Sequence, residues 1–470
     1  MEGQAIRHRV IPDLGTLVSN RAGRFAAARG DASHRFVSGQ ATDSDIDILT
    51  ASGIMPSQKH QIHSVSLDVQ TRARLTAPAA LNYLILVPTL RCNLSCSYCQ
   101  VSRADIGASG YDWSDETLAS VMSLLGGLDT ASIKIEFQGG EPTLRLDHIR
   151  AIIDRCSRFE RAEFVICTNL SKISNDLREL LSDPRVHIST SLDGDRAYQK
   201  SQRTASAEAT DQFFTNLTEV LDIVGPDRLS ALPTIDPRNP PDPDLLLDAY
   251  QAYGLRHIFL RPINFQGFAR KRHPESRDDH SAWWAYLDRF YNRIFERNYT
   301  DRSVLFEETY LTLCLKRMFR IGVDGHVDLR NPNPVGHDYI VIDYDGAIYP
   351  TDEARMLTRS GVVDLRIGSV TDGYDSQLRQ ILDHNSTNLG DPDCEKCVYQ
   401  AFCGRDVIDD LARYGRIDMA RHETFFCQKH LRLFDLAMKF AYSDDAKVQY
   451  SLTRWLGLSG DRLPTLPTLS

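Results

Sequence analysis

Residues 88–100 read Pro88-Thr-Leu-Arg-Cys-Asn-Leu-Ser-Cys-Ser-Tyr-Cys-Gln100, and this stretch places Cys92, Cys96 and Cys99 in the spacing C-x3-C-x2-C. An aromatic residue, Tyr98, precedes the last thiol. Iron–sulfur clusters are normally held by four cysteine thiolates. Three thiolates can hold three irons of a cubane cluster and leave the fourth iron open, and an open coordination site is where a metal does chemistry.

Two simpler interpretations of the triplet compete with this one. A structural zinc site usually takes four ligands, whereas this segment offers three. The cysteines could also be buried residues of no function, although three at this spacing in one loop would then be a coincidence. The triplet therefore favours a cluster with an open iron.

The composition narrows the functional class. The chain has 470 residues, which is room for about three domains. Its net charge of −9 argues against a nucleic-acid binder, which usually carries a basic patch. We find no apolar run of about 20 residues and no apolar core of a signal peptide. We expect a cytoplasmic protein that binds neither nucleic acid nor membrane, in which clustered cysteines bind metal.

Strand-like and helix-like segments alternate from residue 81 onwards. Six strands with crossover helices predict a parallel sheet, and right-handed crossovers would curl it into a barrel-like layer. Functional residues in such sheets gather at the C-terminal ends of the strands, where the cysteine triplet falls. The predicted strands are 81–90, 133–137, 163–168, 185–192, 228–234 and 256–262, and the predicted helices are 114–125, 146–159, 211–224 and 243–253.

The flanking regions have a different pattern. Residues 1–80 resemble a small separate module with a hairpin around 9–20 and a short helix over 44–52. Asp345-Gly346 predicts a second hairpin turn within 339–350, and residues 463–470 predict a mobile tail. We therefore divide the chain into 1–80, 81–300, 301–445 and 446–470.

A second motif, Glu136-Phe-Gln-Gly-Gly-Glu-Pro-Thr143, ends the second predicted strand. Paired glycines let a backbone approach a ligand closely, and carbonyls with a carboxylate could receive an ammonium group. Alone, the run could equally be an ordinary strand-to-helix turn. Beside the cysteine triplet it favours a ligand site.

Together the two motifs resemble the radical S-adenosylmethionine (SAM) superfamily, whose hallmark is C-x3-C-x-aromatic-C after the first strand and Gly-Gly-Glu-Pro after the second. The resemblance implies an α/β fold: a partial (β/α)6 barrel, here with a small N-terminal domain and a C-terminal extension. It also implies a [4Fe–4S] cluster that binds SAM and generates a 5′-deoxyadenosyl radical. Gly139, Gly140 and Glu141 would line the methionine end, with Gln138 as a further cofactor-binding candidate.

Two further strand ends carry polar residues. Cys167-Thr-Asn-Leu170 closes the third predicted strand and Ser189-Thr-Ser-Leu-Asp-Gly194 the fourth. In related enzymes a serine of the second run and a later arginine hold the SAM carboxylate, which implies Ser191 and Arg203 here. Asn169 is a candidate for the ribose region. Each residue could instead simply cap a strand end.

A second cysteine group, Cys394, Cys397, Cys403 and Cys427, has the spacing C-x2-C-x5-C-x23-C. Four thiolates complete a closed site, and zinc and a [4Fe–4S] cluster are both possible on chemistry alone. The group resembles the distal auxiliary cluster of the SPASM extension found in peptide-modifying radical SAM enzymes, which implies an auxiliary [4Fe–4S] cluster.

The chain departs from the full SPASM pattern at two ligand positions, which are Val407 and Thr351. We therefore predict one auxiliary cluster rather than two. The other cysteines, Cys156, Cys167 and Cys314, are predicted to be core residues. In sulfatase-maturing relatives an aspartate just after the Thr351 position takes a proton from the substrate, so Asp352 and Glu353 are candidate catalytic bases. A solvated acidic pair is the competing interpretation.

Longer runs over residues 84–430 resemble the B-type maturase of His-Xaa-Ser peptide systems; they include Thr89-Leu-Arg-Cys-Asn93, Phe164-Val-Ile-Cys-Thr-Asn-Leu170 and Thr351-Asp-Glu-Ala-Arg-Met356. This resemblance implies a precursor peptide with a leader as substrate, and an electron donor such as flavodoxin or ferredoxin. The product would be a crosslink between an aromatic ring carbon and a β-carbon, a cyclophane. Residues 1–80 could bind the leader as an added strand or be a structural cap.

Three other functions compete with this prediction. A radical SAM oxidase or epimerase of a peptide or protein, similar to the sulfatase maturases, would use the same motifs. A zinc-binding scaffold would use both cysteine groups structurally. An anaerobic preparation with about eight irons per chain would exclude the scaffold, because two cubane clusters hold that number.

Overall fold

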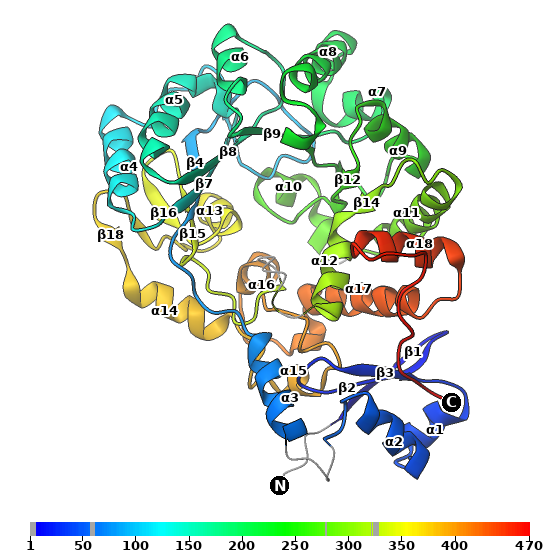
Figure 1. Ribbon diagram of the computed structural model, residues 1–470. Helices are drawn as coiled ribbons and strands as arrows, with labels where there is room; N and C mark the ends of the chain where they lie inside the picture. Colours follow the sequence, from blue (N-terminus) through cyan, green and yellow to red (C-terminus); the bar gives the residue numbers. More distant parts are fainter. Residues whose placement is uncertain (1–5, 57–61, 278–279, 321, 323–328) are drawn as a thin grey trace.

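The computed structural model describes residues 6–56, 62–277, 280–320, 322 and 329–470. Its largest sheet has nine strands in the order β10-β9-β8-β7-β4-β15-β16-β17-β18, and neighbours from β10 to β15 run parallel (Figure 1). The strands are β4 (Tyr83–Thr89), β7 (Ser132–Gly139), β8 (Arg161–Cys167), β9 (Val186–Thr190), β10 (Leu229–Ala231), β15 (Tyr339–Ile342), β16 (Ala347–Tyr349), β17 (Gly368–Ser369) and β18 (Gly373–Tyr374). The predicted α/β class and parallel sheet are confirmed.

Crossover helices cover the outer side of the parallel strands (Figure 1). Four of these helices begin with a residue that is favoured at the N-cap position. The side chains of these residues accept hydrogen bonds from first-turn amides: Ser114, Ser174, Ser206 and Asp242. The helices are α4 (Asp115–Gly127), α5 (Leu146–Arg155), α6 (Asn175–Leu181), α8 (Ala207–Val224) and α9 (Pro243–Ala252). The four predicted helices are confirmed, and α6 is one that the sequence analysis did not predict.

The sixth predicted strand does not join the large sheet. Its residues form β12 (His257–Ile258), which pairs with β14 (Glu307–Glu308), and β13 (Arg261–Pro262), which pairs with β11 (Thr234–Ile235). Pro233 separates β10 from β11, and a proline has no amide hydrogen to continue a ladder. The place beside β4 is taken instead by β15 from the C-terminal half.

The C-terminal half begins with helices and then extends the sheet. The predicted hairpin forms as β15 and β16, and Gly346 adopts φ +81 in its turn. The helices of this half are α11 (Ser281–Thr300), α12 (Thr309–Phe319), α13 (Asp352–Arg359), α14 (Ser376–Asn385), α15 (Pro392–Lys396), α16 (Val407–Tyr414), α17 (Phe425–Ala441) and α18 (Ala446–Trp455).

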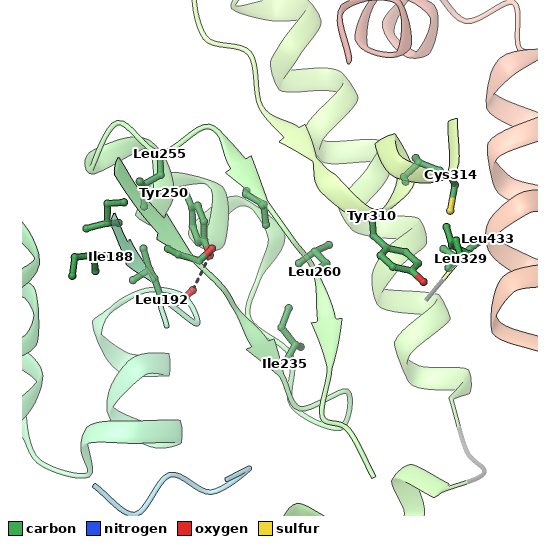
Figure 2. Close-up of a cluster of buried hydrophobic side chains, with 14 of the residues drawn as sticks. Ile188, Leu192, Ile235, Tyr250, Leu255, Leu260, Tyr310, Cys314, Leu329 and Leu433 are labelled. Carbon is green, nitrogen blue, oxygen red and sulfur yellow. Dashed lines mark hydrogen bonds between the residues drawn. The ribbon is translucent and has the colours of Figure 1, made fainter. Parts of the chain in front are cut away.

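A continuous apolar core joins the sheet to these helices. Figure 2 shows Ile188 and Leu192 beside Tyr250, whose hydroxyl donates to the Leu192 carbonyl at 3.2 Å. Cys314 lies in the same core near Leu433, as predicted for a structural cysteine. Among the described helices, none combines the length and the apolar character needed to cross a membrane.

The N-terminal module is a small sheet with three helices, drawn in blue in Figure 1. Its elements are β1 (Arg7–Ile11), β2 (Gly15–Ser19), β3 (Phe25–Ala28), α1 (Asp31–Val37), α2 (Asp43–Ala51) and α3 (Ile62–Ala73). The predicted hairpin and short helix are confirmed. The expectation of a mobile tail is wrong, because β19 (Thr468–Leu469) pairs in parallel with β3 and completes this sheet.

Candidate functional site

A cavity of about 380 Å³ opens at the C-terminal ends of β4, β7, β8 and β9. Parallel strands bring residues from distant parts of the sequence to this rim. The cavity wall contains the triplet cysteines, most of the predicted SAM contacts and both candidate bases: Cys92, Cys96, Cys99, Gln138, Gly139, Gly140, Asn169, Ser191, Arg203, Asp352 and Glu353.

The three triplet cysteines are free thiols and partly buried in this wall. Burial raises the pKa of the Cys92 thiol to about 11 and also raises that of Cys96. Ligand thiols must lose their protons to bind metal. Because burial disfavours the charged thiolate, the positive charge of a bound metal would have to stabilise it.

Single-ion binding and cluster binding make different demands on these thiols. Among the described residues, no three His, Cys, Asp or Glu side chains converge on one ion position. A single zinc ion requires such convergence, whereas each thiolate of a cubane cluster binds a different iron. The three thiols line one cavity, as the ligands of three different irons of a cubane cluster would.

The glycine pair of the second motif packs against the segment that leads into the cysteine loop. A Cβ on Gly140 would lie 2.2 Å from the Arg91 carbonyl oxygen, and one on Gly139 would lie 2.2 Å from that of Thr89. The Gly140 amide donates to the Thr89 carbonyl at 3.0 Å and the Glu141 amide to the Arg91 carbonyl at 2.8 Å. Because Gly139 and Gly140 have no side chain, their backbone packs directly against residues 89–91. Both glycines also line the cavity.

Glu141 has a different environment from its neighbours. Its side chain is buried, and its carboxylate accepts hydrogen bonds from the backbone amide of Asn169 at 2.8 Å and from the Thr143 hydroxyl at 2.6 Å. The cavity wall contains Gln138, Gly139 and Gly140 but not Glu141. The carboxylate therefore joins the end of β7 to the end of β8.

Arg203 reaches the cavity from the π-helical turn η3 (Lys200–Thr204). Its Nη1 donates to the Tyr98 hydroxyl at 2.7 Å, and that hydroxyl donates to Asp193 Oδ2 at 2.5 Å. Asp193 is fully buried and accepts from the Thr234 amide at 2.9 Å. The aromatic residue of the cysteine motif thus connects a cationic side chain to a buried carboxylate beside Cys96.

The other two predicted SAM contacts lie at strand ends. Asn169 Nδ2 donates to Asn93 Oδ1 at 2.9 Å and lies 3.9 Å from the Cys92 sulfur. Ser191 follows β9, and its carbonyl accepts from Gln199 Nε2 at 3.0 Å. Asn169 and Ser191 both line the cavity, at the strand ends where the sequence predicted functional residues.

The candidate bases begin helix α13, directly after the β15–β16 hairpin. Thr351 caps this helix by accepting from the Ala354 amide at 3.0 Å. Asp352 pairs with the fully buried Arg355 at 2.7 Å. Because β15 lies beside β4, residues more than 250 positions apart in the sequence share one cavity.

The same wall contains a carboxylate, Glu136, for which the sequence predicted no role. Glu136 accepts hydrogen bonds from the Tyr83 hydroxyl at 2.5 Å, from Gln138 Nε2 at 2.5 Å and from the Cys167 thiol at 3.2 Å. Burial, together with the Glu136 charge, raises the pKa of both Tyr83 and Cys167. The prediction that Cys167 is a core residue is wrong. The alternation of Lys134, Glu136 and Gln138 along β7 was the available signal.

A second cavity, of about 390 Å³, is lined by all four cysteines of the C-terminal group. Burial raises the pKa of the Cys427 thiol to about 11, and the Tyr399 amide donates to the Cys397 sulfur at 3.4 Å. His8 and Arg9 of strand β1 complete part of the wall. Val407, which stands where the SPASM pattern has a cysteine, is a buried residue of α16.

Comparison with known proteins identifies the domain. Residues 86–235 match the model of the Radical SAM superfamily. An uncharacterized protein of Methanocaldococcus jannaschii is 32% identical over 117 residues, which are 24% of this chain and 39% of that protein. A protein of Methanothermobacter thermautotrophicus is 29% identical over 126 residues, or 26% of this chain and 46% of that protein. The chain matches less than half the length of either relative.

Solved structures extend the similarity beyond this domain. The structure of anSMEcpe with bound AdoMet and Cp18Cys peptide has a TM-score of 0.58 at 17% identity, covering 76% of this chain and 99% of that one. Streptococcus suis SuiB bound to precursor peptide SuiA has a TM-score of 0.51 at 13% identity, covering 90% and 99%. Identities this low show a shared fold.

The match over residues 86–235, the parallel sheet and the cysteine triplet agree with one another: this part of the chain is similar to the Radical SAM superfamily in sequence, fold and motif. The C-terminal extension continues the sheet and carries the second cysteine group, and the whole is similar in fold to anSMEcpe and SuiB.

Proposed function

We propose that this protein modifies a ribosomally made precursor peptide by forming an intrapeptide crosslink from an aromatic ring carbon to a β-carbon. The observation that carries the proposal is the shared cavity, whose wall combines three thiols for a cluster, the candidate SAM contacts and two carboxylates. Two proteins that share the fold were solved with peptides bound, which supports a peptide substrate.

Three groups of residues in the cavity wall would have different roles. Cys92, Cys96 and Cys99 would hold a [4Fe–4S] cluster, which with SAM supplies a 5′-deoxyadenosyl radical able to remove a substrate hydrogen. Arg203 offers the charge to bind a carboxylate group, and the Tyr98–Asp193 pair fixes its position. The glycine pair keeps the cysteine loop against the end of β7.

Asp352 is our candidate for the general base. Closing the crosslink removes two hydrogens from the peptide: one as the abstracted atom, the other as a proton and an electron. The ion pair with Arg355 holds the Asp352 side chain at the cavity wall. The cysteines of the second cavity would hold an auxiliary cluster that receives the electron.

Product mass tests the proposal. Purified, reconstituted protein with SAM, a reductant and the precursor peptide should give a product lighter by two hydrogens, in which the joined segment resists fragmentation. An unchanged mass would contradict the crosslink. A mass that is unchanged in ordinary water but raised by deuterium in heavy water would indicate epimerisation instead, and a two-hydrogen loss with normal fragmentation would indicate a simple oxidase.

A further inference from the structure

The sheet of the N-terminal module has the strand order β1-β2-β3-β19, and its two ends are held in different ways. At one edge, Arg7 Nε of β1 donates to the Glu395 carbonyl at 2.8 Å, and Arg9 pairs with Asp435 at 2.8 Å. At the other edge, β3 pairs with β19, which comes from the opposite end of the chain (Figure 1). An extended segment that is to pair with this edge of β3 must therefore replace β19.

The β19 segment is held as a bound peptide would be. The Ala27 amide donates to the Pro467 carbonyl at 3.1 Å and the Arg29 amide to the Leu469 carbonyl at 2.9 Å. Leu469 is 1% exposed, while Thr468 is exposed. Backbone bonds with one buried side chain in a pocket are the marks of strand addition to a sheet edge.

Small residues make the space for Leu469. Its side chain lies in a separate apolar cluster of the module, in which β3 and α1 contribute three alanines, Ala26, Ala28 and Ala32. Leu49 of α2 packs in the same cluster. The cluster therefore encloses one branched aliphatic side chain carried on an extended backbone.

The two edge strands of this sheet, β1 and β19, are not held equally firmly. Strand β1 pairs with β2 over five residues and carries the contacts of Arg7 and Arg9. Strand β19 pairs with β3 over two residues, and its segment accepts one hydrogen bond from the Tyr442 hydroxyl and one from Arg35 Nη2. Pro464 and Pro467 lack amide hydrogens, so the tail has fewer donors to offer. Segments with few contacts open at the lowest free energy, which makes β19 the exchangeable neighbour.

We propose that the β3 edge is a docking site for an extended peptide bearing a leucine-sized side chain, and that residues 464–470 are its resident occupant, displaced when such a peptide binds. The inference rests on the proposed function, because the precursor peptide is the partner that would bring this segment. Binding would then exchange one strand for another.

Competition with the tail determines how much the apparent affinity of a free peptide is lowered. A segment tethered beside its own site has an effective concentration on the order of 1 mM. If a free peptide binds the empty edge with a dissociation constant of about 0.1 mM, the tail weakens its apparent binding about tenfold.

The test uses a labelled peptide with the sequence Arg462-Leu-Pro-Thr-Leu-Pro-Thr-Leu-Ser470 and fluorescence anisotropy. In the full-length chain, Leu469→Asp would put a charge into the apolar pocket and release the tail. We expect the labelled peptide to bind this variant about tenfold more tightly than the unchanged chain. Thr468→Asp, at the exposed neighbouring position, is the matched control and should bind like the unchanged chain.

Equal binding by all three chains, or no binding to a folded Leu469→Asp variant, would overturn the proposal. Should that variant fail to fold, hydrogen exchange on the unchanged chain decides: excess peptide should speed exchange in residues 463–470, and unaltered exchange would refute displacement. Neither measurement needs iron, SAM or turnover. A negative result would therefore leave the proposed chemistry standing, and a positive one would survive its failure.

Discussion

Gly140→Ala should dislodge the cysteine loop without touching a cysteine. The new Cβ would lie 2.2 Å from the Arg91 carbonyl oxygen and 2.4 Å from that of Leu90. Both atoms belong to the backbone just before Cys92, so no side chain can rotate away. Restoring an ordinary contact of 3.4 Å to the nearer oxygen requires about 1.2 Å of backbone movement.

Two magnitudes follow from that displacement. Overpacking a well-packed site costs about 1–3 kcal/mol, so the free energy of unfolding should fall by that amount in a denaturant titration of the metal-free chain. A misplacement of about 1 Å at a reacting centre can reduce a rate about 100-fold. Reductive cleavage of SAM by the reconstituted variant should therefore slow by about that factor, because Cys92 moves with Arg91.

Gly127→Ala is the matched control. Gly127 ends helix α4, and a Cβ there meets nothing within 4 Å. Alanine is favoured over glycine in a helix by about 0.5–1 kcal/mol, so this variant should be as stable as the original chain or slightly more stable. If Gly140→Ala and Gly127→Ala behaved alike in stability and in SAM cleavage, the role assigned to the close contact with residues 90–91 would be wrong.

Three further predictions concern the base, the second cavity and the N-terminal module. Asp352→Asn should keep SAM cleavage but lower crosslinked product by about 100-fold or more, as removal of a general base does, while Asp345→Asn at the exposed hairpin turn should leave product formation intact; mass spectrometry measures both. Cys403→Ala should reduce bound iron from about eight to about four per chain, whereas the core variant Cys314→Ala should keep all of it by iron assay. Asp45, whose bond with the Arg35 guanidinium and the Thr42 amide lowers its pKa from 3.8 to about 2, should contribute stability above about pH 4 and lose it as the pH falls toward 2. The difference in melting temperature between the original chain and Asp45→Asn should thus shrink between pH 5 and pH 3, and a constant difference would contradict this role.

Local patterns predicted the elements, while long-range pairing decided their arrangement. The apolar runs and cap residues of the β/α region lie within a few positions of the helices and strands they specify, so five of six predicted strands appear in the sheet as expected. The position of β15 beside β4 depends on pairing Tyr339 with Tyr83 across the fold, and no short window contains that information. The same holds for β19 and β3.

The candidate site shows the same division. Spacing alone singled out the cysteine triplet, because its three thiols lie within one short loop. Glu136 was missed because its relevance depends on which face of β7 points into the cavity, and this is settled only when β4 and β8 take their places. The environment of Glu141 also escaped prediction, since its partner, the Asn169 backbone amide, lies just beyond the end of the neighbouring strand β8.

The cysteine loop is therefore positioned chiefly by its neighbours. Its first residue pairs over the short bridge of β5 (Arg91–Cys92) with β6 (Ala104–Asp105), and residues 93–103 contain no strand or helix. The glycine pair of β7 holds it from one side, and Asn169, fixed by Glu141, contacts Asn93 from another. The Gly-Gly-Glu run and the Thr-Asn run are thus two halves of one support. A change in either should move Cys92, even where the changed atom never reaches the cavity.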